Sequence, residues 1–206
     1  MSSDTTLARD VVHDYWLDPS DPWEQPSNYV GSFPRSEVLL ELLEPRTTPS
    51  DQVLEVGCGA GANLAHLHDR GYRDLAAIEL NPEMLALFET TYEPTFRATD
   101  VRRGSLEHEI WEFPSDGVDA TAAVTVLAHL HPTSEFVFDE LVRVTADWLV
   151  TVENETTDDR VFFPRNYRDV FESRGCRQVD VVDSETLHER TELSDNCVAR
   201  VFAVGT

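Results

Sequence analysis

Closely spaced glycines separate an apolar run from a helical one near residue 57. The apolar run reads Val53-Leu-Glu-Val, and Gly57, Gly59 and Gly61 follow it at every second position. Glycine allows a tight turn and lets the backbone approach a ligand, while the next helix offers its unpaired N–H groups at the same point. This order of strand, glycine turn and helix predicts the first unit of an α/β sheet, with a ligand site at the turn.

Short β-type runs alternate with helical runs over most of the remaining chain. After the strand at residues 52–56, four more are expected at residues 75–79, 95–99, 118–125 and 148–152. Helices are expected between the strands, and Val137, Leu141 and Val144 give one of them an apolar face. Such alternation predicts a parallel sheet that is covered by helices.

The two runs nearest the C-terminus follow a different pattern. Val179 and Val181 alternate with polar residues, which is typical of a half-exposed edge strand, whereas residues 200–204 are more apolar. No periodic stretch of helix length separates the two runs, so we expect them to form an antiparallel pair. The predicted fold is a doubly wound α/β sheet, mostly parallel with a terminal antiparallel strand pair.

The N-terminal part of the chain differs from the rest. Helices are expected at residues 8–16 and 36–43, and the prolines at this density within residues 16–34 exclude regular structure there. We therefore expect an N-terminal helical and proline-rich extension over residues 1–49 and a single domain over residues 50–206.

Two roles are open for this extension. A long irregular segment in a small domain often covers a functional site, and aromatic side chains suit such a contact surface. In that case Tyr15, Trp16, Trp23 and Arg35 form a lid against the substrate. The alternative is a segment that only lies on the surface.

Acidic residues outnumber basic ones by 39 to 16, which gives a formal net charge of −23, and every basic residue is an arginine. A surface of this kind predicts adaptation to high salt, where repulsion between carboxylates is screened; an ordinary acidic protein is the alternative. The charge weighs against nucleic acid as a partner, because phosphate contacts require clustered cations.

No run approaches the ~18 consecutive apolar residues of a membrane-spanning helix, and the N-terminus lacks the layout of a secretory signal. We therefore expect a soluble cytoplasmic protein without a membrane partner. Cys58, Cys176 and Cys197 show no C-x-x-C spacing. This spacing predicts small buried side chains and no metal site.

Acidic residues lie at or near the ends of the first three expected strands. Glu55 is inside the first strand, Glu79 closes the second, 79 − 59 = 20 residues after Gly59, and Asp100 closes the third. Open α/β sheets bind ligands at this edge, where a carboxylate can accept both hydroxyls of a ribose. A further carboxylate disfavours a pyrophosphate but suits a ligand with an amine, a sulfonium and an adenine amino group.

Three motifs stand at these positions: Glu55-x-Gly57-x-Gly59-x-Gly61, Ile78-Glu79-Leu-Asn-Pro-Glu-Met-Leu85 and Thr99-Asp100-Val101. Together they resemble the class I S-adenosylmethionine-dependent methyltransferases, over about residues 50–206. The resemblance implies a Rossmann-like fold, S-adenosylmethionine as the cofactor and methyl transfer as the reaction.

The resemblance also implies a role for each residue. The glycine turn would surround the methionine moiety and Glu55 would hold its amino end. Glu79 would bind the ribose hydroxyls, and Asp100 would face the adenine amino group with a backbone contact from Val101. Further expected cofactor contacts are Gly57, Cys58, Gly59, Gly61, Leu80 and Thr125. The alternative for the two later acids is that they only cap the helices that follow.

The segment after the fourth strand, Thr125-Val-Leu-Ala-His129-Leu-His131-Pro132, resembles the family's segment at the reactive face of the cofactor. His129 and His131 are candidate general bases, because an unshifted imidazole titrates near ~6.5. A base is needed only where the acceptor carries a proton that must leave. A packing or helix-capping role is the alternative for each histidine.

Arg165, Tyr167 and Arg168 follow the fifth strand, where the family has its acceptor-side loop. An arginine there could bind a carboxylate or phosphate of the substrate with two hydrogen bonds, or could simply pair with a surface acid. We expect in-line methyl transfer to a small-molecule acceptor. Two other functions stay open: an NAD(P)-dependent oxidoreductase and a non-catalytic module that binds S-adenosylmethionine.

Overall fold

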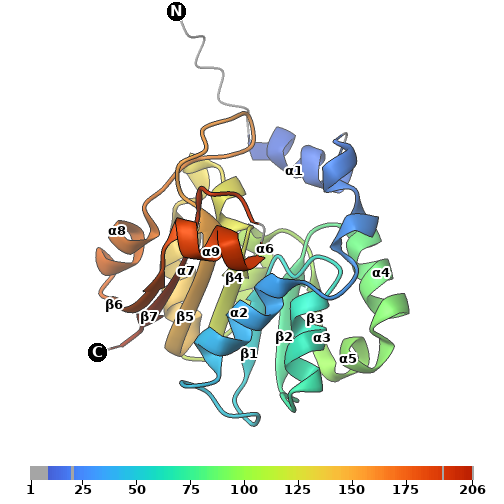
Figure 1. The fold of residues 1–206 in the computed structure, drawn as a ribbon, viewed down its shortest axis with the longest axis horizontal. Helices are drawn as coiled ribbons and strands as arrows, with labels where there is room; N and C mark the ends of the chain where they lie inside the picture. The colour runs from blue at the N-terminus through green and yellow to red at the C-terminus, as the bar shows by residue number, and fades with distance from the viewer. Residues whose placement is uncertain (1–8, 20, 192, 206) are drawn as a thin grey trace, which may run out of the picture.

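The computed structural model describes residues 9–19, 21–191 and 193–205. Its strands form one sheet in the order β3-β2-β1-β4-β5-β7-β6 (Figure 1). β7 runs antiparallel to both of its neighbours, β5 and β6, whereas all other neighbouring strands pair in parallel. The bounds are β1 (Val53–Val56), β2 (Leu75–Glu79), β3 (Thr99–Arg103), β4 (Val118–Val124), β5 (Thr145–Asn154), β6 (Arg177–Val182) and β7 (Cys197–Ala203). The prediction of a doubly wound, mostly parallel sheet with a terminal antiparallel pair is confirmed.

Helices cover both faces of the sheet (Figure 1). One face carries α2 (Pro34–Leu43), α3 (Ala62–Asp69), α4 (Pro82–Thr91), α5 (Glu93–Ala98) and α9 (Ser184–Thr191). The other carries α6 (Leu106–Glu109), η3 (Ile110–Glu112), α7 (Phe136–Val144) and α8 (Tyr167–Glu172). Val137, Leu141 and Val144 are fully buried, as their spacing predicts. The burial of apolar residues against both faces supplies the main driving force for this fold.

The third strand begins later than predicted. Residues 95–98 belong to α5, which starts with Pro94 in its first turn and turns Phe96 against Phe88, with ring centroids 5.2 Å apart. The strand therefore starts at Thr99, and Asp100 pairs with Ala76 near the amino end of β2. The prediction that Asp100 closes this strand is wrong, because the helix displaces the strand toward the C-terminus.

The expectation that no helix lies between the last two strands is also wrong. The helix α9 occupies residues 184–191, and Leu187, its one apolar residue, is fully buried. A single apolar anchor gives no periodic pattern, so the sequence does not reveal this helix. Thr191 is also buried, and Arg190 pairs with Glu41 of α2 at 2.5 Å.

The N-terminal extension lies over one edge of the sheet. It contains α1 (Arg9–Leu17), the short helical turns η1 (Pro22–Glu24) and η2 (Pro26–Tyr29), and α2, while residues 1–8 lie outside the described residues. Figure 1 shows α1 above the sheet, and Asn81, directly after β2, donates a hydrogen bond to the Trp16 carbonyl at 2.8 Å. The part of the extension before α2 therefore covers the carboxyl edge of the strands, while α2 packs on one face.

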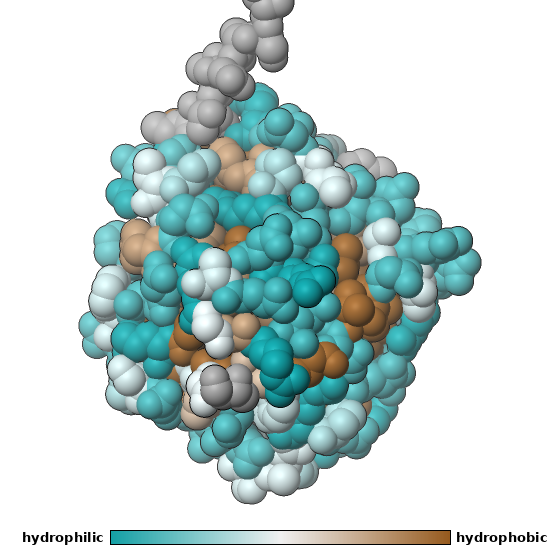
Figure 2. All heavy atoms as spheres, turned by 90° about the vertical axis from the view of Figure 1, so that its left-hand side faces the viewer, coloured by the Kyte–Doolittle hydropathy of each residue, from teal (hydrophilic) through white to brown (hydrophobic). Residues whose placement is uncertain are grey.

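Hydrophilic residues cover most of the face drawn in Figure 2, with hydrophobic residues in small separate areas. Several arginines pair with surface carboxylates, for example Arg46 with Asp180 at 2.8 Å. Cys58, Cys176 and Cys197 are free and buried, as predicted. Within the described ranges, no helix is long and apolar enough to cross a membrane.

Candidate active site

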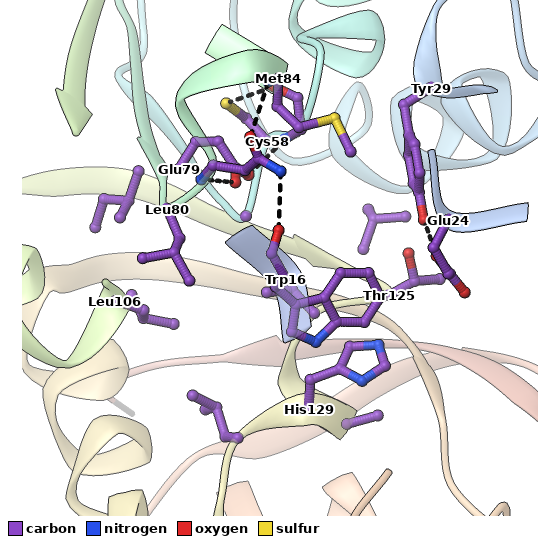
Figure 3. A pocket seen from close by; sticks show the side chains of 18 of the residues that line it. Trp16, Glu24, Tyr29, Cys58, Glu79, Leu80, Met84, Leu106, Thr125 and His129 are labelled. Carbon is purple, nitrogen blue, oxygen red and sulfur yellow. Dashed lines mark hydrogen bonds between the residues drawn. The ribbon is translucent and has the colours of Figure 1, made fainter. Parts of the chain in front are cut away.

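A cavity of about 430 Å³ opens at the carboxyl edge of the sheet, beneath α1 and the segment that follows it. It brings together most of the residues that the sequence predicts for the site. These are Trp16, Arg35, Glu55, Gly57, Cys58, Gly59, Glu79, Leu80, Thr125, His129 and His131. Figure 3 shows Trp16 in the middle of this cavity, with Leu80 and Leu106 on one side and Glu24 and Tyr29 on the other.

The glycine turn leaves no room for side chains at two of its positions. Gly57 and Gly61 have φ values of +66° and +78°, which other residues rarely adopt. A Cβ atom on Gly57 would lie 2.4 Å from the Val126 side chain, and one on Gly61 would lie 2.3 Å from the Phe88 ring. Gly57 and Gly59 line the cavity, whereas Gly61 packs against Phe88 instead. The turn therefore exposes backbone to the cavity and packs tightly behind it.

Glu79 ties the end of β2 to the glycine turn. Its carboxylate accepts hydrogen bonds from the backbone N–H of Gly59 at 2.9 Å and of Asn81 at 2.7 Å. Asn81 also caps α4, since its side chain accepts from the N–H of Glu83 and Met84. Burial raises the pKa of Glu79, and the backbone hydrogen bonds oppose that shift. The backbone thus holds the buried carboxylate of Glu79 in the cavity wall.

Glu55 is 1% exposed, and only one of its two carboxyl oxygens has a hydrogen-bond partner among the described residues. Its Oε1 accepts from the Asn63 side chain at 2.7 Å, and Asn63 in turn accepts from the Ser36 hydroxyl at 2.6 Å. Its Oε2 is buried and has no hydrogen-bond partner among the described residues. Burial raises the pKa of Glu55 to about 8. An unpaired buried oxygen is costly, so this atom is available to a polar group of a ligand in the cavity.

Arg35 lies in the same part of the cavity. Its guanidinium stacks on the Phe33 ring at 3.9 Å from the centroid, and it makes no ion pair with any residue that the structure describes. Burial lowers the pKa of Arg35, while the charge of Glu55 raises it. The cavity therefore offers a guanidinium and a carboxyl group together, each with unused hydrogen-bonding capacity.

His129 lies at the other end of the cavity, in the turn η4 (Leu127–His129). Its Nδ1 is 2.7 Å from the Val161 carbonyl, which can only accept, so Nδ1 carries the proton and Nε2 bears the lone pair. The imidazole ring lies between Trp16 and Phe162, with both ring centroids 4.4 Å away. Burial lowers the pKa of His129 to about 4. The histidine is therefore neutral at pH 7, with Nε2 as an acceptor.

Residues 53–147 match the family described as "Methyltransferase domain". This match includes the glycine turn, Glu55, Glu79 and His129. Over these residues the chain is a class I S-adenosylmethionine-dependent methyltransferase domain. No curated protein sequence matches the chain.

Solved structures share the fold of this methyltransferase domain at low sequence identity. The geranyl diphosphate C-methyltransferase from Streptomyces coelicolor A3(2), bound to Mg²⁺, geranyl diphosphate and S-adenosyl-L-homocysteine, has a TM-score of 0.73 and 12% identity, covering 96% of this chain and 97% of that one. The magnesium protoporphyrin IX methyltransferase ChlM from Synechocystis PCC 6803 has 0.72 and 12%, covering 96% and 100%. A complex of the Haloferax volcanii Trm112 methyltransferase activator with a putative methyltransferase has 0.62 and 15%, covering 84% and 93%.

Three expected cofactor contacts of the methyltransferase domain lie outside the cavity: Gly61, which packs against Phe88, and Asp100 and Val101. Asp100 is three residues before the end of β3, about 10 Å along the strand, and its exposed carboxylate pairs with Arg102 at 2.9 Å. Val101 lies beside it, packed against the core on the α2 face. The cavity wall at the end of β3 is formed instead by residues 104–107. A strand boundary that is wrong by a few residues thus moves a predicted acid to the opposite end of the sheet.

Several expected acceptor-side residues have structural roles. Arg165 donates to Glu135 at 2.7 Å and to the Leu130 carbonyl at 2.8 Å, so it cannot clamp a substrate anion without losing these bonds. Tyr167 is fully buried in the core, which excludes the predicted substrate contact. His131 caps the turn η5 (Pro132–Ser134) by accepting from the Thr133 N–H at 3.1 Å. Tyr15 does not line the cavity but packs edge-on against Trp16, and the side chain of Trp23 is not among those that the structure describes.

Sequence reasoning missed three residues in or close to the cavity wall. Tyr29 covers the glycine turn, because a Cβ atom on Gly59 would lie 3.9 Å from its ring, and its hydroxyl donates to Glu24. Glu107 lies in the cavity wall and holds α1 through His13 at 3.1 Å. Glu153 closes an apolar run in β5, which is the same signal that identifies Glu79 in β2.

Proposed function

We propose that this chain transfers the methyl group of S-adenosylmethionine to a small, uncharged acceptor that presents an O–H or N–H group. The size of the cavity, about 430 Å³, suits a nucleoside cofactor together with a small acceptor. Structures with the same fold include enzymes whose names state small substrates, geranyl diphosphate and magnesium protoporphyrin IX. We propose an uncharged acceptor because Arg165, in the loop after β5, already donates to Glu135 and to the Leu130 carbonyl.

The observation that carries the proposal is the unpaired Oε2 of Glu55, which lies in the cavity with Arg35. A free amino acid has an ammonium and a carboxylate on one carbon. An ammonium would satisfy Oε2, and the carboxylate would pair with the unused guanidinium. A ligand with a methionine moiety supplies both groups. We therefore assign Arg35 to the cofactor rather than to the acceptor.

The other cofactor contacts follow from the order of the strands. The glycine turn would lie beside the methionine chain, and Glu79 would accept the ribose hydroxyls. The adenine would reach the wall at the end of β3, where Ser105 and Leu106 replace Asp100 and Val101 in our assignment. The bound cofactor supplies a sulfonium methyl group that is already activated for displacement.

The residues of this chain then orient the acceptor and exclude water. Trp16 and Phe162 provide flat apolar walls on both sides of His129. The lone pair on Nε2 accepts a hydrogen bond from the acceptor and directs its oxygen or nitrogen toward the methyl group. An imidazole with a pKa of about 4 is a weak base, so we assign His129 mainly an orienting role. We propose that α1 and the segment up to Tyr29 form the lid.

Calorimetry of the full chain with S-adenosylmethionine, S-adenosylhomocysteine, NAD and NADP tests the proposal. We expect the two methionine-containing ligands to bind and the dinucleotides not to bind. Glu55→Gln and Arg35→Gln should each weaken binding at least about tenfold, the loss of one charged hydrogen bond. Arg168→Gln, which removes an exposed arginine paired with Glu172, is the matched control.

Binding of NAD or NADP in place of S-adenosylmethionine would contradict the proposal. Consumption of bound S-adenosylmethionine on addition of a metabolite extract, with S-adenosylhomocysteine as the product, is the further expected result. A chain that binds the cofactor but never forms this product would be a binding module and not an enzyme.

A further inference from the structure

A buried carboxylate lies close behind the acceptor side of the cavity. Glu153, near the end of β5, is 0% exposed and does not line the cavity. A charge at such a position is costly unless hydrogen bonds satisfy it. Its location next to the turn that carries His129 points to a task in the site rather than in the core.

Three backbone N–H groups of that turn converge on the carboxylate. Val126 and Leu127 donate to Oε1, both at 2.9 Å, and Ala128 donates to Oε2 at 3.2 Å. These are the free N–H groups at the start of η4, which no helical carbonyl can satisfy. The carboxylate of Glu153 thus takes the place of a preceding helical turn.

The chain enters this turn in an unfavourable conformation. Thr125 has a φ of +54°, which a β-branched residue rarely adopts, and its N–H donates to the Val152 carbonyl at 2.8 Å. Such a conformation persists only where the surroundings hold it in place. The bonds to Val152 and Glu153 supply this support from two consecutive residues of β5.

We infer that Glu153 is a positioning residue, which holds the turn at residues 125–129 so that His129 presents Nε2 to the acceptor. The ring is then fixed from two sides, by Glu153 through the backbone and by the Val161 carbonyl through Nδ1. The inference rests on the proposed function only in naming the group that His129 meets. The positioning itself is a property of the free protein.

Both carboxylate oxygens are needed for this task. A glutamine at position 153 keeps one accepting oxygen for Val126 and Leu127 but turns an N–H group toward the N–H of Ala128. An alanine removes all three acceptors. The two variants therefore predict a graded loss, which a general loss of packing would not produce.

Amide hydrogen exchange of the ¹⁵N-labelled full chain tests the inference. In Glu153→Ala we expect exchange at Val126, Leu127 and Ala128 to accelerate at least about tenfold, the factor for one lost hydrogen bond to a charged group. In Glu153→Gln the acceleration should be largest at Ala128. The control is Glu140→Gln, another buried glutamate, which pairs with Arg143 on α7 and should leave these amides unchanged.

The imidazole resonances of His129 provide the reading that separates positioning from stability. In both Glu153 variants the pKa of His129 should rise from about 4 toward its ordinary value, because the ring leaves its slot between aromatic residues. Unchanged amides, unchanged His129 signals, or equal effects in Glu140→Gln would overturn the inference. Neither cofactor nor acceptor is required, so failure to bind S-adenosylmethionine leaves this test intact.

The native protein offers a test that does not depend on the folding of variants. Burial raises the pKa of Glu153 to about 7, and the other titratable groups that face it are Glu155, Tyr167 and Cys197. Protonation near this pH removes one acceptor, so the amide signals of residues 126–128 should titrate together with the Glu153 carboxyl carbon. Amide signals that do not follow this carboxyl would overturn the inference.

Discussion

The cofactor side and the acceptor side of the cavity are built in different ways. On the cofactor side, Glu55 bonds a residue 8 positions later, and Glu79 bonds residues 20 positions earlier and 2 later. On the acceptor side, the corresponding contacts join residues far apart in sequence. His129 and Val161 are 32 positions apart, and Trp16 and Asn81 are 65 apart.

This difference separates a local module from an assembled surface. Two neighbouring strands and the glycine turn bring Glu55, Gly59 and Glu79 together within a short stretch of chain, and packing of α2 adds Arg35. The acceptor side exists only when α1, η4 and the loop after β5 pack around one another. We therefore expect substitutions on the cofactor side to act through backbone and charge, and those on the acceptor side to act through the attachment of separate elements.

Gly61→Ala should give the largest effect, through the backbone of the cofactor side. The new Cβ would lie 2.3 Å from the Phe88 ring at a φ of +78°. Overpacking and left-handed strain together should lower the free energy of unfolding by about 2–5 kcal/mol. Urea unfolding measures this change. Gly175→Ala, with a φ of +89° and nothing within 4 Å, should cost only about 1 kcal/mol; an equal loss would mean that packing against Phe88 is unimportant.

Glu79→Gln should come next, with an effect on binding. We expect the affinity for S-adenosylmethionine to fall by about 2–3 kcal/mol, since hydrogen bonds to a charged group are lost. Asp100→Asn, the acid at the other end of the sheet, should leave the affinity within about twofold. Calorimetry distinguishes the two, and a large loss in Asp100→Asn would restore the role that its sequence motif first indicated.

Proton release should accompany cofactor binding. The pKa of Glu55 is about 8 because the carboxyl is buried, so at pH 7 the free protein holds this proton. A ligand ammonium favours the ionised form, and binding should release close to one proton. Calorimetry in buffers of different ionisation enthalpy measures this number, which Glu55→Gln should reduce to near zero. In the free protein the raised pKa contributes stability below pH 4.5 that is lost as the pH rises through about 8.

The smallest effect should be the loosening of α1 as the pH rises. The hydrogen bond to Glu107 raises the pKa of His13 above 6.5, and the contact keeps the pKa of Glu107 at about 2 against its burial. This stability is fully present below pH 6.5 and is lost as the pH rises through the raised pKa of His13. We expect the free energy of local opening, measured by hydrogen exchange over residues 9–17, to fall by up to ~1 kcal/mol.

His13→Ala should remove this pH dependence, whereas His68→Ala on α3 should retain it. If the opening free energy of α1 does not depend on pH in the native chain, other contacts hold α1 without the help of His13. The hydrogen bond between Asn81 and Trp16 is one such contact.

The amino-acid sequence by itself determined the local parts of this protein. The order of strands, the glycine turn, the cap at Asn81 and the placement of Glu55 and Glu79 follow from periodicity, steric rules and spacing within about 30 residues. These signals are readable because each one depends on neighbours along the chain. They sufficed for the sheet, its terminal antiparallel pair and the cofactor side of the cavity.

Tertiary structure alone decided the rest. Whether Asp100 reached the site depended on where α5 ended, and whether Arg165 was free depended on Glu135 and the Leu130 carbonyl, 30 and 35 positions away. Contacts of α1 such as that between His13 and Glu107 span 94 positions. A charged side chain pairs with whichever group the folded chain brings near it, and no local pattern encodes that partner.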